Sequence, residues 1–306
     1  MSFHKFGKYL ITILTIVVVG VFVIKYQQDF SKVRDITITQ FLQLFVLSSL
    51  TISVNGLKVK LITSTAGIRL SFREWFGLAS ISISLNGIFS KTGSVVTSNY
   101  LKRAYGFPYM SYVGAFAGDF LITLLISAWI GLVVSLYLVI FVKPDYTFLV
   151  AGFLIVIMSL FLLLKSNLNF QRHHYRIIDT IIRAITSLNS LLQNKKLFWN
   201  LCCFGIMLLM LSALRFYVAS TVLHLDIPIS YCFLFAIIIM AVRALPLLQG
   251  DIGTRELAIG LMSEFLGTGL KEGFLVAVVD RIAILFWCLF FAAFYQNILI
   301  AKKPTD

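Results

Sequence analysis

The chain has 306 residues, 59% of them hydrophobic and 13% charged, with a formal net charge of +13. Its apolar runs approach or exceed the roughly 18 to 20 residues that cross a bilayer, so the composition predicts an all-α polytopic integral membrane protein. Lysine and arginine lie in short connections between these runs, which indicates cytoplasmic loops rather than a nucleic-acid surface. No polar stretch is long enough for a separate soluble domain.

Six membrane-spanning helices are expected in chain order. Their approximate ranges are 9–24, 36–57, 109–142, 146–164, 197–223 and 273–300. The first follows Lys5 and Lys8, and no small-residue cleavage site comes after it, which favours an uncleaved helix with its N-terminus inside the cell. The second is followed by a basic stretch that begins at Lys58 and is expected to be a cytoplasmic loop.

Two shorter apolar runs, 75–89 and 229–245, are predicted to be re-entrant helices. If 75–89 crossed the membrane fully, Lys102 and Arg103 would lie outside, against the positive-inside rule. A segment that enters and returns avoids this conflict. The basic insert 165–196 has helical apolar spacing and is interpreted as an amphipathic surface helix, with a solvated connector as the alternative.

Two blocks of sequence can be laid over each other as an internal repeat. In the first, LFVLSSLTISVNGLKVKL is followed by SFREWFGLASISISLNGIF, then SKTGS, then a long helix with Asp119. In the second, MLLMLSALRFYVASTVLHL is followed by ISYCFLFAIIIMAVRAL, then QGDIG, then a long helix with Asp280. Gly93 precedes Asp119 by 26 positions, and Gly253 precedes Asp280 by 27.

The opening helices of the two blocks are expected to cross the membrane in opposite directions. An inverted repeat of this kind is the architecture of many secondary transporters. We therefore predict one transmembrane domain over 1–306, with inverted halves at about 36–142 and 197–300. The span 146–164 and the basic loop 165–196 join the halves.

The joint of the second re-entrant hairpin, PLLQGDIGTRE at 246–256, concentrates polar residues after an apolar run. Pro246 is expected to stop the incoming half-helix, and Gly250 and Gly253 allow tight turning and close backbone approach. Irregular backbone at membrane depth is tolerated only inside protein or beside a water-filled cavity. The free amides that start the outgoing half-helix, with Arg255, therefore predict a site for an anion such as a lipid phosphate.

Ionisable residues inside a membrane are expensive and usually functional. With the glycines of the second tip, the candidate substrate-binding residues are Lys91, Asp119, Arg215, Arg243, Gly250, Asp251, Gly253, Arg255, Glu256, Asp280 and Arg281. Structural alternatives stay open, because Arg255 and Glu256 could pair or cap a helix and Arg243 could snorkel. Asp280 and Arg281 point about 100° apart on a helix, so each needs a partner elsewhere. Asp119 and Arg243 are the candidate partners.

The residues give no sign of a metal, a cofactor or catalytic machinery. Cysteines occur only in apolar segments, at Cys202, Cys203, Cys232 and Cys288, and are expected to be small buried side chains. His173 and His174 have no partner at metal-ligand spacing. There is no Ser–His pair at catalytic spacing and no phosphate-transfer motif, so neither an enzymatic activity nor a cofactor is expected.

The order of segments and the second tip resemble the lysylphosphatidylglycerol synthase transmembrane-region family, also called flippase-like. The family pattern there is roughly P-x-S-x-G-G-x-G-x-R-E, which this chain matches at Pro246, Gly250, Gly253, Arg255 and Glu256 and leaves at Leu248 and Asp251. In the first half, Asn86, Lys91 and Gly93 can be placed on the family pattern, but its proline is absent and Ser94 replaces its glutamate. Gly118–Asp119 stands where Glu-Arg is common in the family.

The resemblance implies movement of charged or lipid-linked lipids across a membrane, or a role beside envelope-lipid and glycan synthesis. A lipid translocase in the cytoplasmic membrane, with both termini cytoplasmic, is the function expected. A non-transporting accessory protein is the alternative. Expected partners are membrane lipids with an anionic or polyprenyl-linked headgroup and proteins of envelope-lipid or glycan biosynthesis.

Overall fold

The computed structural model describes residues 35–88, 92–165, 194–244 and 253–301, and the regular structure in these ranges is entirely helical. The helices are α3 (Ile38–Ser64), α4 (Phe72–Ile88), α5 (Thr92–Tyr105), α6 (Tyr109–Phe141), η2 (Pro144–Tyr146), α7 (Thr147–Lys165), α9 (Lys195–Val222), α10 (Ile229–Ala244), α11 (Thr254–Phe265) and α12 (Leu270–Ala301). The all-α fold class is confirmed.

Five helical stretches are long and apolar enough to cross a membrane. They are Ile38–Ser64, Gly114–Phe141, Pro144–Leu162, Lys195–Val222 and Leu270–Tyr295, and each corresponds to a predicted span. The sixth predicted span, 9–24, lies outside the described residues, as does nearly all of the basic insert 165–196. Helix α10 is apolar but shorter than a span, and its re-entrant path stays a prediction.

Helix α3 continues seven residues beyond its predicted end at 57, so the expected loop beginning at Lys58 is wrong. The apolar residues Val59, Leu61 and Ile62 continue the helical pattern. Lys58 itself is only 6% exposed and forms an ion pair inside the protein. A buried lysine with a partner does not mark a loop, because its charge is compensated without solvent.

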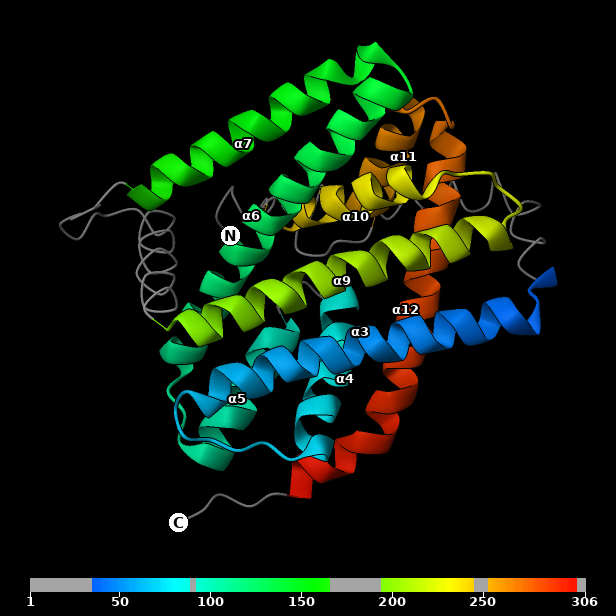
Figure 1. Cartoon of the computed structure of the whole chain (residues 1–306). Helices are drawn as coiled ribbons and strands as arrows, with labels where there is room; N and C mark the ends of the chain where they lie inside the picture. Colours follow the sequence, from blue (N-terminus) through cyan, green and yellow to red (C-terminus); the bar gives the residue numbers. More distant parts are fainter. Residues whose placement is uncertain (1–34, 89–91, 166–193, 245–252, 302–306) are drawn as a thin grey trace, which may run out of the picture.

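Eight of the described helices fall into two series of four with similar lengths; η2 and α7 lie between the two series. Helices α3 to α6 have 27, 17, 14 and 33 residues, and α9 to α12 have 28, 16, 12 and 32. Figure 1 shows α3 and α9 side by side in opposite directions, and α6 and α12 also run oppositely. An inverted repeat would have these lengths and directions; the division into halves stays a prediction.

Side-chain packing agrees with the antiparallel arrangement of α3 and α9. Leu44, near the start of α3, packs with Val218 and Val222 near the end of α9. Further along, Val54 packs with Leu208 and Leu211. The two helices therefore lie against each other over most of their lengths (Figure 1).

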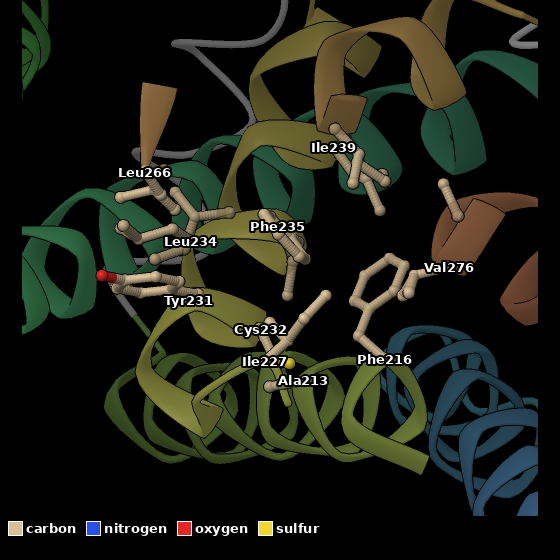
Figure 2. Close-up of a cluster of buried hydrophobic side chains, with 14 of the residues drawn as sticks. Ala213, Phe216, Ile227, Tyr231, Cys232, Leu234, Phe235, Ile239, Leu266 and Val276 are labelled. Atoms are coloured by element: carbon tan, nitrogen blue, oxygen red, sulfur yellow. The ribbon is translucent and has the colours of Figure 1, made fainter. Parts of the chain in front are cut away.

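A hydrophobic cluster around α10 fixes the second half. Figure 2 shows Phe216 of α9, Phe235 of α10 and Val276 of α12 pointing toward one another, all fully buried. In a bilayer, helices associate by close packing, which small residues permit; Ala213 and Ala277 are fully buried here. This packing holds α10 against α9, while α10 also contacts α6 and α11.

A second cluster holds α4 in the first half. Trp75, Phe76 and Leu78 of α4 pack with Ile284 and Cys288 of α12. Helix α12 is thus shared: it contacts α11 in its own half and α4 in the other.

The prediction that the cysteines are small buried side chains holds for Cys232 and Cys288, which are buried, but it is wrong for the exposed Cys203; Cys202 is half-buried. Cys203 is on an apolar helix face that is not covered by protein.

Candidate functional site

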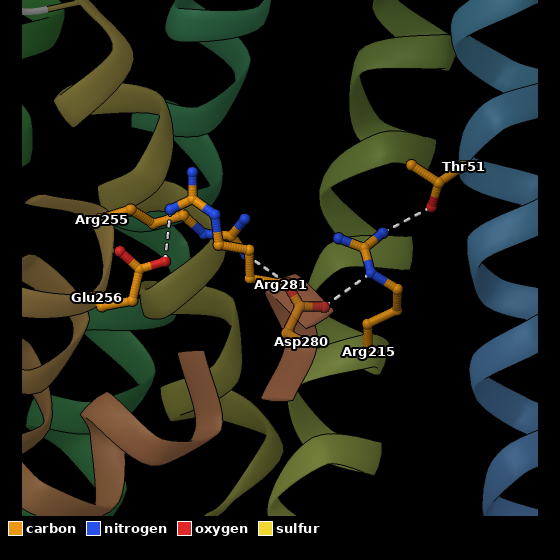
Figure 3. Close-up of polar contacts among 6 residues, drawn as sticks. All are labelled: Thr51, Arg215, Arg255, Glu256, Asp280 and Arg281. Carbon is orange, nitrogen blue, oxygen red and sulfur yellow. Dashed lines mark hydrogen bonds and ion pairs between the residues drawn. The ribbon is translucent and has the colours of Figure 1, made fainter. Parts of the chain in front are cut away.

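Five charged side chains from three helices of the second half form one buried group, which we call the arginine cluster. Its members are Arg215 on α9, Arg255 and Glu256 in the first turn of α11, and Asp280 and Arg281 in α12 (Figure 3). Helix α12 packs against both α9 and α11, and this packing brings the five side chains close together.

Asp280 is the centre of the arginine cluster and is fully buried. Its Oδ1 accepts from Arg215 Nε at 2.8 Å, and its Oδ2 accepts from Arg255 Nη2. An unpaired carboxylate would be very costly in this position, so the two guanidinium groups are needed to keep it there. Arg215 also donates from Nη1 to Thr51 Oγ1 at 2.7 Å, which connects the cluster to α3.

Glu256 caps its own helix and binds α12. Its Oε2 accepts from the backbone N–H of Gly253 at 2.7 Å, and its Oε1 accepts from Arg281 Nη1 at 2.6 Å. Gly253 has φ +85°, a left-handed conformation that glycine adopts without strain. The helix start is therefore held in place by a carboxylate, which also suits the positive end of the helix dipole.

Arg281 joins the two hairpins of the fold. Besides Glu256, it donates from Nη2 to the carbonyl oxygen of Gly87 at 2.7 Å. Gly87 is in the last turn of α4, just before the tip of the first hairpin (α4–α5), whereas Glu256 follows the tip of the second (α10–α11). One guanidinium thus bridges residues next to both tips.

Arg255 has a buried hydrogen-bond donor that no described residue uses. It is 7% exposed, and its Nε has no hydrogen-bond partner among the described residues. Its guanidinium carbon lies 5.7 Å from the centre of the Phe216 ring, within the range of a cation–π contact. A buried donor without a partner is rare in folded proteins, which makes Arg255 a candidate for ligand contact.

A separate buried ion pair lies in the first half. Lys58 Nζ of α3 is 2.8 Å from Asp119 Oδ1 of α6 and 3.4 Å from Thr123 Oγ1. This pair is neutral as a unit and shares no described contact with the arginine cluster.

The structure brings most of the predicted site residues together. Arg215, Gly253, Arg255, Glu256, Asp280 and Arg281 are in or next to the arginine cluster. The prediction of Asp119 as a partner of the Asp280–Arg281 charges is wrong, because Asp119 pairs with Lys58. Lys91, Gly250 and Asp251 lie outside the described residues, and Arg243 is in the last turn of α10 with its side chain undescribed.

Sequence reasoning missed Thr51, Lys58 and the Gly87 carbonyl. The Gly87 carbonyl leaves no sequence signal because every residue has one. Thr51 does not stand out because α3 contains several other serines and threonines. Lys58 had a signal: it is 20 residues after the start of α3, as Arg215 is 20 residues after the start of α9. The alignment of the internal repeat used above begins at Leu44 and Met207 and therefore aligns Arg215 with Ile52. This alignment hides the correspondence between Arg215 and Lys58.

Five apolar helices of spanning length, two short-helix hairpins and a buried charge cluster define a multi-pass α-helical membrane protein. The chain belongs to the family of the lysylphosphatidylglycerol synthase TM region, whose model matches residues 9–292. Comparison with curated proteins and with solved structures found no match.

Proposed function

We propose that this protein is a lipid translocase that moves an anionic or lipid-linked headgroup across the cytoplasmic membrane, without changing the lipid chemically. The observation that carries the proposal is the arginine cluster: three arginines face two carboxylates, buried beside the start of a broken helix. Ionisable residues buried inside a membrane protein are expected to mark a substrate path.

The headgroup is expected to meet the cluster from the side of Arg255. Two features favour that side: the unpartnered Nε of Arg255 and the amide groups at the start of α11, where the helix dipole attracts anions. Because each arginine already contacts a carboxylate, a phosphate can exchange with a carboxylate without leaving a guanidinium unpaired. Such exchange lowers the barrier that a charged group meets in apolar surroundings.

The same proposal includes the protein's setting. Both termini are placed on the cytoplasmic side, in keeping with the positive-inside rule. Its partners are membrane lipids with an anionic or polyprenyl-linked headgroup, and proteins of envelope-lipid or glycan biosynthesis that supply or use them. No enzymatic step is part of the proposal.

Reconstitution of the purified chain tests the proposal. Vesicles of phosphatidylcholine would contain a trace of phosphatidylglycerol with a fluorophore on one acyl chain, and dithionite added outside would bleach only the outer leaflet. Protein-containing vesicles are expected to lose the protected inner-leaflet signal, and protein-free vesicles to keep it. Mass spectrometry should recover the labelled lipid unchanged.

Two outcomes would contradict the translocase proposal. A protected signal that persists with well-folded protein would favour the accessory role, in which lipid is bound but not moved. A change in the mass of the recovered lipid would instead indicate an enzyme. The substitution Arg103→Lys, at an exposed position on α5, is the matched control and should translocate like the wild type.

A further inference from the structure

We infer that Phe216 is a positioning residue of the candidate site. Its ring holds the guanidinium of Arg255, so that the Nε donor, which no described residue uses, stays in place for an anion. This inference rests on the proposed function and adds to it a residue that acts through Arg255.

Four side chains form a closed ring of contacts between three helices. Arg215 and Phe216 are neighbours on α9, and neighbouring residues point about 100° apart on a helix, so α9 presents two faces here. Arg215 Nε is 2.8 Å from Asp280 Oδ1, on α12. Asp280 Oδ2 accepts from Arg255 Nη2, and the Arg255 guanidinium lies over the Phe216 ring. Helix α9 therefore holds Arg255 both through Asp280 and directly.

The contact with Phe216 fixes the plane of the Arg255 guanidinium without using its donors. The guanidinium carbon is 5.7 Å from the ring centre, and the attraction comes from the face of the ring. Because the N–H groups of a guanidinium lie in its plane, a ring over its face leaves them free to donate. The hydrogen bond to Asp280 alone would let the group turn about that bond, whereas bond and ring together hold it. A donor that is fixed before binding costs less entropy to use.

Phe216 is itself held in position by α10. It is fully buried, and its ring centre is 6.1 Å from that of Phe235, with an angle of 87° between the ring planes. Figure 2 shows the two side chains pointing toward each other. Phe235 is on the first helix of the second hairpin and Arg255 is on its second helix, α11. The position of Arg255 therefore depends on α10 through the Phe216 ring.

The first half of the fold has neither the ring nor the arginine at the corresponding positions. Phe216 is 21 residues after the start of α9, and Val59 is 21 residues after the start of α3. Arg255 is two residues after the tip glycine of its hairpin, and Val95 is two residues after the tip glycine of the first. The ring thus occurs in the half in which the arginine occurs, which agrees with a role toward Arg255 rather than with packing alone.

Fluorinated phenylalanines at position 216 test the inference. Ring fluorines withdraw electrons from the face of the ring and weaken a cation–π contact, while they scarcely change the size of the ring. The full chain would carry one, two or three ring fluorines at Phe216 and be titrated calorimetrically in neutral detergent with short-chain phosphatidylglycerol. We expect the affinity to fall with each added fluorine, by about tenfold in total.

Two controls separate positioning from packing. Three ring fluorines at Phe107, a buried phenylalanine of the first half, should leave the affinity at the wild-type value. A double-mutant cycle with Arg255→Met removes the cation, so fluorination of Phe216 should lower the unfolding midpoint of the wild type but not that of the Arg255→Met protein. A ring that only fills space would give the same shift in both proteins.

The inference is overturned if the wild-type protein binds no phosphatidylglycerol, or if its affinity does not change with fluorination of Phe216. It is also overturned if fluorination of Phe107 lowers the affinity as much, or if the midpoint shift does not depend on Arg255. These results are independent of translocation. A protein that moves lipid without any dependence on the fluorines refutes only the inference, and one whose binding weakens with fluorination but which moves no lipid refutes only the translocase.

Discussion

Lys58 and Arg215 occupy the same position in corresponding helices, 20 residues after the starts of α3 and α9. Each pairs at 2.8 Å with an aspartate that is 10 residues into the last helix of its half, Asp119 in α6 and Asp280 in α12. The pairs are thus related by the proposed inverted repeat, although one is isolated and the other is part of the arginine cluster.

Removal of the Asp280 charge should destabilise the protein. In Asp280→Asn, Arg215 and Arg255 lose their shared carboxylate, and breaking a buried ion pair typically costs about 3 to 5 kcal/mol. Thermal unfolding in detergent should show a clearly lower midpoint, and adding Arg215→Gln should recover part of the loss in a double-mutant cycle. Asp145→Asn, at an exposed position, is the control. A folded, unshifted but inactive Asp280→Asn protein would make Asp280 a transport residue rather than a structural one.

The Lys58–Asp119 pair is expected to be structural only. Single substitutions leave a buried charge and should lower the unfolding midpoint, whereas Lys58→Met with Asp119→Leu replaces both charges by apolar groups and should be nearly neutral. The double variant should also keep wild-type phosphatidylglycerol affinity. Loss of that affinity in a well-folded double variant would show that the first half takes part in binding.

Gly93 is expected to tolerate no side chain. A Cβ at Gly93 would collide with the backbone of Ser82 in α4, so Gly93→Ala must push α5 away from α4. Overpacking of this kind costs about 1 to 3 kcal/mol, measurable as a lower unfolding midpoint. Gly152→Ala is the matched control, because a Cβ there meets nothing within 4 Å. Equal midpoints for the two variants would argue against close packing of the first hairpin.

Cysteines placed next to the two tips test whether the hairpins are re-entrant. Gly93 and Gly253 are unsuitable for this purpose because of the Ser82 collision and the positive φ, but the neighbouring Thr92 and Thr254 are half-buried helix starts. At both positions we expect reaction with small thiol reagents and protection from bulky impermeant ones. Rapid bulky labelling from either side of the membrane would make the tips ordinary surface loops.

Hydropathy was sufficient to predict the five described spans, because apolar runs of this length have few other uses. The charged residues of the second half were also recognisable, since arginine and aspartate are rare in such runs. The partners of these charged residues could not be recognised from the sequence. Asp280 meets Arg215 and Arg255 because α9 and α11 converge on α12, and this depends on packing between helices far apart in sequence.

The hydrogen bond from Arg281 to the Gly87 carbonyl has a consequence for motion. Because its acceptor is a backbone oxygen, α4 cannot move along α12 by a helical turn without breaking this hydrogen bond. After such a movement Arg281 would keep its contact with Glu256 but not the one with Gly87. The strength of the Glu256–Arg281 contact at one tip consequently depends on the position of the other. A ligand that draws Glu256 away from Arg281 should therefore change how firmly α4 is held, so the two hairpins are expected to be thermodynamically linked.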